Sequence, residues 1–227
     1  MNEVTTTQAN ALADVPQNYI AGMLEATRRK FLEINAGMDL DFVRIAQWIK
    51  MNKKGDFVLR NDEDTNFGDT LDVIIAQGEQ RHLLWGLKAS PEEGELLVAE
   101  KTSEEAERIL EAWLESSPER RERYSIDDIK LCYLAYVVLV STLTPEDMPE
   151  IYIISFPETG TISYGQYAAL LMRGIKSKGI PKWTGIAQVV TRIGTETKKG
   201  KSNDEYLAYT FEAVGMFKPE EFGIKVE

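Results

Sequence analysis

The segment that decides the predicted fold covers residues 151–215 and reads IYIISFPETGTISYGQYAALLMRGIKSKGIPKWTGIAQVVTRIGTETKKGKSNDEYLAYTFEAVG. Ser163 is a good helix cap, and Gly179 with Pro181 ends the helical pattern. Alternating apolar residues then indicate two long strands. The predicted elements are a strand over 150–156, a helix from Ser163 to Lys176, strands over 182–194 and 205–216, and a loop rich in Gly, Lys and Ser over 195–204.

An earlier stretch, DFVRIAQWIKM over 41–51, alternates as a strand with two different faces does. A turn at 52–55 and a returning strand over 56–60 predict a β-hairpin. Further strands are predicted over 71–77, 81–87 and 131–143, and the last is apolar on both faces, as in a covered central strand. One face of the first strand carries Val43, Ile45, Ile49 and Met51, and the other carries Phe42, Arg44, Ala46, Trp48 and Lys50.

Three further helices are indicated by their capping residues. Asn18 caps a predicted helix that runs to about Ile34. Thr102 and Glu105 form a capping-box pattern, and Pro118 suits the first turn of a short helix. We expect a flexible N-terminus over 1–17, a single domain over 18–216 with an acidic helical insertion at about 88–128, and a tail over 217–227.

These patterns predict a mainly β (α+β) fold, an OB-like antiparallel β-barrel with an N-terminal helix and helical insertions. Roughly seven to nine predicted strands mostly follow one another directly, which does not fit an alternating βαβ fold. A helix before the last strand pair, with a long loop inside that pair, is a frequent way to build an OB-type barrel.

Charge is unevenly distributed along the 227 residues, whose formal net charge is −11. Residues 61–128 carry 19 acidic and 7 basic side chains, a net charge of −12. Residues 161–203 have a net charge of +7, and residues 41–60 a net charge of +3. Because binding depends on where the charges lie, the negative total does not exclude a nucleic-acid partner.

Residue types exclude several other classes of protein. The single cysteine, Cys132, rules out an internal disulfide and a Cys-rich zinc site, and the single histidine, His82, is better explained as structural. No GxxxxGK[ST], HExxH or GxSxG motif occurs, so we predict no enzyme, no catalytic residue, no metal and no cofactor. The apolar run 131–140 is too short to cross a bilayer, and residues 1–15 do not read as a secretory signal. These features predict a cytoplasmic protein without a membrane partner.

Aromatic and basic side chains alternate on the first predicted strand, where Arg44, Trp48 and Lys50 share a face. Single-stranded nucleic acid requires that combination, because aromatic rings stack on bases while cations follow the phosphates. Trp183 alternates with core positions, so we expect it in the core unless it lies at the open end of its strand. The predicted nucleic-acid-binding residues are Arg44, Trp48, Lys50, Lys53, Lys54, Arg60, Lys182, Arg192, Lys198, Lys199, Lys201 and Tyr206.

The strand FVRIAQWIK with its hairpin, together with the block over 151–215, resembles the OB-fold single-stranded DNA-binding proteins of bacteriophages and related mobile elements. In those proteins a strand ends in a short turn containing proline, a helix crosses the barrel, and two final strands flank a basic loop. The resemblance implies a protein that coats single-stranded DNA during replication or recombination in the host cytoplasm. It also implies replication or recombination proteins as partners, and leaves a homo-oligomer open.

Two other functions remain open from the sequence. Aromatic residues next to arginine are also typical of protein interfaces, so a protein-interaction or structural module of a phage or plasmid is the first alternative. A metal-dependent nuclease that uses the acidic residues is the second, although no matching ligand spacing is present.

Overall fold

A single strongly curled sheet dominates the computed structural model, which describes residues 46–144, 149–200 and 203–223 together with Gly22, Arg29 and Glu33. Eight strands are neighbours in the order β3-β2-β1-β7-β6-β4-β8-β9, and β5 pairs with β4 beside this path. The strands are β1 (Gln47–Met51), β2 (Phe57–Leu59), β3 (Asn66–Gly68), β4 (Thr70–Trp85), β5 (Leu96–Glu100), β6 (Lys130–Leu139), β7 (Ile151–Phe156), β8 (Val189–Lys199) and β9 (Glu205–Met216).

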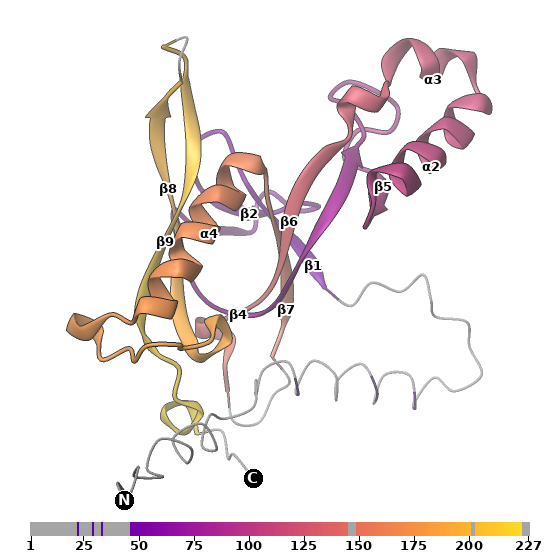
Figure 1. The fold of residues 1–227 in the computed structure, drawn as a ribbon. Helices are drawn as coiled ribbons and strands as arrows, with labels where there is room; N and C mark the ends of the chain where they lie inside the picture. Colours follow the sequence, from indigo (N-terminus) through magenta and orange to yellow (C-terminus); the bar gives the residue numbers. More distant parts are fainter. Residues whose placement is uncertain are drawn as a thin grey trace, which may run out of the picture.

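Three α-helices and several short 3₁₀ turns accompany the sheet in the described residues (Figure 1). The α-helices are α2 (Ser103–Glu115), α3 (Pro118–Arg123) and α4 (Glu158–Arg173). The 3₁₀ turns are η2 (Ile126–Asp128), η3 (Val140–Thr142), η4 (Lys176–Lys178), η5 (Ile186–Gln188) and η6 (Pro219–Phe222). The predicted helix over 18–34 lies outside the described residues, apart from Gly22, Arg29 and Glu33.

The fold is α+β and mostly strands, as predicted, but the expectation of a closed antiparallel barrel is wrong. β1 and β7 run parallel, so the sheet is mixed. The sheet curls into a half-barrel, and its two sides meet through a side chain where the Thr195 hydroxyl donates to the carbonyl of Gly55 at 3.0 Å. The sheet does not close into a barrel, because β1 pairs with the edge of β7 that another strand would need for closure.

Helix α4 fills the concave side of this half-barrel (Figure 1). Its buried residues Tyr164, Tyr167 and Leu171 join the largest apolar cluster of the sheet. The Phe156 ring lies 5.8 Å from Tyr164, centroid to centroid. The hydroxyls of Tyr167 and Thr191 hydrogen bond at 2.7 Å, which satisfies both buried polar groups. The interior is therefore a packed aromatic core.

One long strand, β4, replaces the two strands predicted over 71–77 and 81–87. Its centre is continuous because Gly78 takes part in the ladder with β6. A Cβ at Gly78 would lie 2.1 Å from the Tyr133 hydroxyl, so the tyrosine ring occupies the space that a side chain would need. The glycine therefore allows a ring to cross the strand and does not mark a turn.

The prediction of a covered strand over 131–143 is confirmed in its principal feature. Ala135 and Val137 of β6 are buried on the concave side, while Leu134 and Val138 are buried on the opposite side. The strand ends at Leu139, and η3 follows. β6 is therefore the central strand that carries apolar side chains in both directions.

The acidic insertion is partly helical, as predicted. Thr102 accepts a hydrogen bond from the Glu105 amide at 3.2 Å and caps α2, and Pro118 begins α3. The insertion also contains β5, which the sequence analysis missed. Because Leu110 of α2 packs on Leu84 and Val98, the insertion buries its own apolar cluster against the end of β4.

Two boundaries near the C-terminal half differ from the predictions. α4 begins at Glu158, directly after Pro157, and Ser163 lies inside the helix. β8 begins at Val189, because a turn and η5 precede it. Trp183 consequently lies outside the sheet and is 74% exposed, which corrects the expectation of a core position.

Replacing Leu171 with Ala should lower the free energy of unfolding by about 2–5 kcal/mol, because the truncation leaves a cavity between α4 and the sheet. Urea denaturation followed by circular dichroism measures the change. Leu170 is the matched control, since it is 45% exposed, and its replacement by Ala should cost less than about 0.5 kcal/mol. Equal losses in the two variants would contradict this orientation of α4.

Candidate nucleic-acid interface

Two of the predicted binding residues, Trp48 and Arg60, line one pocket of about 380 Å³. The pocket lies between the start of β1, the segment after β2, and the region where β4 turns into β5. We call it the aromatic pocket, because Trp85 from the end of β4 forms another of its walls. Its lining residues are Ala46, Gln47, Trp48, Leu59, Arg60, Asn61, Asp62, Trp85, Gly94 and Leu96.

The geometry of the aromatic pocket is set by three stacked or edge-on groups. The Arg60 guanidinium carbon lies 3.3 Å from the centroid of the Trp85 ring. The Trp48 ring meets Trp85 at a centroid distance of 5.1 Å and an angle of 89°. The Arg60 amide also donates to the Trp48 carbonyl at 2.8 Å, which fixes the backbone beneath the pocket. Strand pairing therefore brings together three residues from distant parts of the chain.

The Arg60 guanidinium lacks a hydrogen-bond acceptor in the described part of the chain. Its Nε atom is buried and unpaired. Desolvation by burial lowers the pKa of Arg60, although arginine stays charged at neutral pH. A guanidinium that stacks through its face keeps its N–H edge free for a planar acceptor or an anion. The pocket thus offers aromatic surface and the guanidinium group of Arg60 to a ligand.

β1 leads away from the aromatic pocket with one face in the main core and the other, which carries Trp48, against a smaller apolar cluster. Ile49 is buried in the core, while Lys50 projects on the side of Trp48. Lys50 forms an ion pair with Glu63, and this contact lowers the pKa of the Glu63 carboxyl. Lys50 therefore lies two residues beyond Trp48 on the same face of β1, and its ammonium group is paired with the exposed Glu63 carboxylate.

The hairpin turn after β1 presents Lys53 and Lys54, both of which are exposed. The Asn52 side chain accepts from the amide of Lys54 at 2.8 Å and shapes the turn. Gly55 has φ +95°, and a Cβ there would lie 2.8 Å from the Thr195 hydroxyl. Since only glycine allows this approach, the turn sits directly against β8.

The outer ends of β8 and β9 form an arm that carries Lys198, Lys199 and Tyr206. Lys198 lies opposite Tyr206 in the ladder and forms an ion pair with Glu196 at 2.8 Å. This contact raises the pKa of the Lys198 ammonium group. Tyr206 is 40% exposed, so its ring is available to a ligand. We call this pair of strand ends the hairpin arm.

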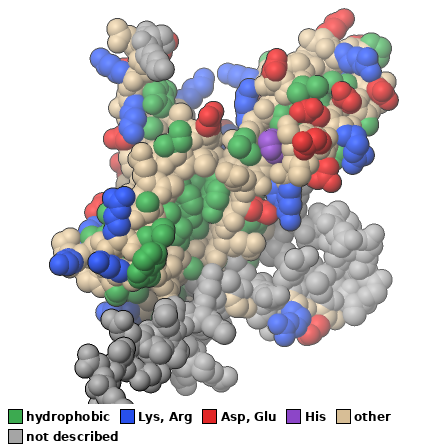
Figure 2. Space-filling model, in the orientation of Figure 1, with side chains coloured by type: hydrophobic (Ala, Val, Ile, Leu, Met, Phe, Trp, Pro, Cys, Tyr) green, Lys and Arg blue, Asp and Glu red, His purple; other side chains and the backbone are tan. Residues whose placement is uncertain are grey.

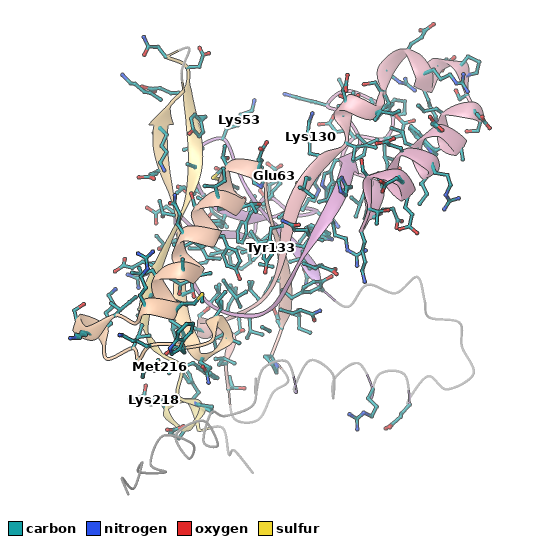
Figure 3. The ribbon with its side chains drawn as sticks, in the orientation of Figure 1. Lys53, Glu63, Lys130, Tyr133, Met216 and Lys218 are labelled. Carbon is teal, nitrogen blue, oxygen red and sulfur yellow. The ribbon has the colours of Figure 1, made fainter. Side chains whose placement is uncertain are left out.

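A notch separates the hairpin arm from the insertion arm, which consists of β5, α2 and α3 (Figure 2). Blue cationic side chains flank the notch on both sides in this view. Figure 3 shows Lys53 and Lys130 in the space between the two arms. Lys130, at the start of β6, was not predicted as a binding residue, because it follows the acidic pair Asp127-Asp128 and belongs to no basic stretch.

The other predicted binding residues lie elsewhere. Arg192 makes a two-point contact with Asp72, at 2.7 Å and 2.8 Å, which raises the pKa of Arg192. Lys182 lines a different pocket, beside Trp183 and α4, that shares no residue with the aromatic pocket. Arg44 and Lys201 lie outside the described residues. Pairing of β1 with β2 thus joins Trp48 with Arg60, and the hydrogen bond from Thr195 to Gly55 holds the turn that carries Lys53 and Lys54 against the base of the hairpin arm.

Trp85 is the principal residue that the sequence analysis missed. It follows the apolar pair Leu83-Leu84, so it reads as one more buried position. A signal was present in the residues after it, since Gly86 is followed by polar residues and a strand end is expected there. Its partner across the pocket, Arg60, is 25 positions earlier in the printed sequence, and only sheet pairing joins them.

The described residues show no group of three or more His, Cys, Asp or Glu side chains placed to hold a metal ion. Asp128 accepts a hydrogen bond from the Ser125 amide at 2.8 Å and caps η2. Among the helices described, none is long and apolar enough to cross a membrane. Comparisons with protein-family models, curated proteins and solved structures found no match to the chain.

Replacing Arg60 with Met should leave the free energy of unfolding unchanged or raise it by about 1 kcal/mol, because the change removes a buried donor without an acceptor. The thioether keeps the contact with Trp85. Replacing Arg192 with Met is the control and should lower the free energy of unfolding only slightly, through loss of the exposed pair with Asp72. Urea denaturation measures both. A loss above about 1 kcal/mol in the Arg60 variant would show that this arginine stabilises the fold.

Proposed function

We propose that the protein binds single-stranded DNA along a track formed by the aromatic pocket, β1, its hairpin turn and the hairpin arm. The observation that carries the proposal is the order of groups on this track. Trp85, Arg60 and Trp48 are followed by Lys50, and then by Lys53 at the notch. β1 advances about 3.3 Å per residue, so roughly 10 Å separate Trp48 from Met51, the last residue of the strand before the turn that carries Lys53.

The chemistry of the track suits a single strand better than a duplex. Aromatic rings stack on unpaired bases, each worth about 1–3 kcal/mol, and every base offers a flat face for such a contact. Lysines beyond the rings attract the phosphates and make the affinity depend on salt. The acidic insertion lies on one side of the notch, where it repels phosphates and favours a path along β1.

The order of strands supports an OB-like origin for this surface. β7, β6, β4, β8 and β9 are neighbours in that order, and α4 connects β7 to β8. This is the order of an OB barrel whose third and fifth strands have separated. In that fold, oligonucleotides contact the second and third strands and the loops after the first and fourth strands. Of the corresponding parts here, the hairpin arm belongs to the proposed track, whereas β1 pairs with the edge of β7 and the insertion arm is acidic.

The resemblance to single-stranded DNA-binding proteins of bacteriophages suggests where the protein would act. A protein of this kind coats single strands during replication or recombination, works in the cytoplasm of the host cell and has no catalytic role. Its affinity would be shared among several weak contacts, because stacking and phosphate contacts tolerate any sequence.

A protein-interaction module is the second candidate function, and the outer face of α4 favours it. Ile162, Met172 and Trp183 are 58%, 51% and 74% exposed, and a green apolar patch covers this part of Figure 2. The sequence between Glu158 and Glu196 contains no acid, so this face suits an acidic, apolar partner segment. Light scattering with and without oligonucleotide separates the two functions, since a DNA-independent increase in mass would favour the module.

Titration with a fluorescein-labelled oligo-dT should show binding that weakens as salt increases. Changing Lys53 and Lys54 together to Gln should reduce the slope of log affinity against log salt by roughly 0.7 for each lysine. Fluorescence anisotropy at several salt concentrations measures the slope. An oligo-dT that does not bind at low salt would refute the proposed function.

Two variants serve as controls for this titration. Lys218 lies at the end of the molecule away from the notch (Figure 3), so its change to Gln should leave the slope unaltered. Trp183→Ser removes an exposed aromatic ring outside the track and should leave the affinity within about twofold. An equal effect of the Lys218 variant would mean that the lysines act only through total charge.

A further inference from the structure

The aromatic pocket differs from a general stacking surface because polar groups surround its rings. The Arg60 guanidinium lines the pocket and its buried Nε has no hydrogen-bond partner in the described residues, and Asp62 lies in the same wall. Gln47 and Asn61 add side-chain amides to the lining. A surface that only stacked on bases would have no use for a desolvated guanidinium, whose burial without a partner costs free energy.

The volume of the pocket limits what it can hold. About 380 Å³ is enough for one nucleobase with part of its sugar, and too little for two stacked nucleotides with their backbone. Trp48 closes one side edge-on, and Trp85 is already covered on one face by Arg60. A base that enters therefore meets the edge of the guanidinium together with aromatic surface.

The donors and acceptors of the wall distinguish among the four bases. Arginine offers two parallel N–H groups, and guanine presents adjacent O6 and N7 acceptors that fit them. Adenine presents an amino group at the position of O6, which would oppose an arginine N–H. The Asp62 carboxylate accepts hydrogen bonds, and guanine alone among the purines offers the N1 and N2 donors to such a group. One Asp62 oxygen is already occupied by the Thr65 hydroxyl at 2.6 Å.

We propose that the aromatic pocket selects guanine, so that a protein that otherwise tolerates any sequence holds one base of the strand by its hydrogen-bonding edge. Arg60 donates to guanine O6 and N7, and Asp62 accepts from the opposite edge. The proposal rests on the proposed function for its biological setting. The pocket itself can be tested with a mononucleotide, independently of strand binding.

The experiment uses the full chain and three labelled 12-mers, namely oligo-dT and the same oligomer with one central guanine or one central adenine. Anisotropy titrations should give at least about fivefold tighter binding for the guanine oligomer than for the adenine oligomer. Arg60→Lys keeps the charge and removes the planar pair of donors, so the ratio of guanine-oligomer to adenine-oligomer affinity should fall to about one, whatever change the variant makes in oligo-dT affinity. Asp62→Asn should reduce the preference in the same direction.

The matched control is Arg81→Lys, because Arg81, which lies on β4, is also an arginine but is paired with Glu79 at 2.9 Å. It should keep the guanine preference. Equal affinity for all three oligomers would overturn guanine selection and leave the proposed function standing. If no oligomer binds, the proposed function fails. Titration with dGMP and dAMP, followed by tryptophan fluorescence, then tests whether the pocket selects guanine. Quenching by dGMP that Arg60→Lys abolishes would support it, and identical curves for the two nucleotides would overturn it.

Discussion

Helix α4 packs its aromatic face into the concave side of the curled sheet, and the positions of the other elements follow from that contact. Tyr164 and Tyr167 meet Phe156 and Phe211 in a cluster of rings that fills the interior. Because interiors are packed as densely as crystals, this space cannot also hold a ligand. A filled interior keeps the strands curled, and it leaves the rim and the outer side of the sheet for binding.

The parallel pairing of β1 with β7 determines the shape of the sheet and the position of the aromatic pocket. It occupies the edge that would otherwise close the barrel, and it places Trp48 beside Trp85 and Arg60. The same strand delivers Lys53 to the base of the hairpin arm through the glycine contact with Thr195. One edge strand thus connects an aromatic pocket with a basic notch. The unpaired donor of Arg60 shows that part of this surface is not optimised for stability.

Local patterns in the sequence were sufficient for several elements. The bounds of β9 agree with the predicted strand over 205–216, and the Thr102 cap begins α2 where the capping box indicated. Propensity and capping act within a few residues, so they are readable in one dimension. The predictions failed where a distant group changed the local outcome. Gly78 was predicted to separate two strands, but it lies within β4, where the Tyr133 ring occupies the space of a side chain.

Periodicity and charge along the sequence were enough to predict the strand-rich class, the two faces of the first strand, the acidic insertion and the basic stretches that are candidates for binding. Periodicity and charge are local properties, so they can be recognised without knowing which strands pair. The tertiary structure decided which of these stretches meet. It united Arg60 with Trp48 and Trp85, paired Arg192 with Asp72, and exposed Trp183 beside α4. Those outcomes depend on strand order and register, which join residues far apart in the chain and leave no signal in their immediate neighbours.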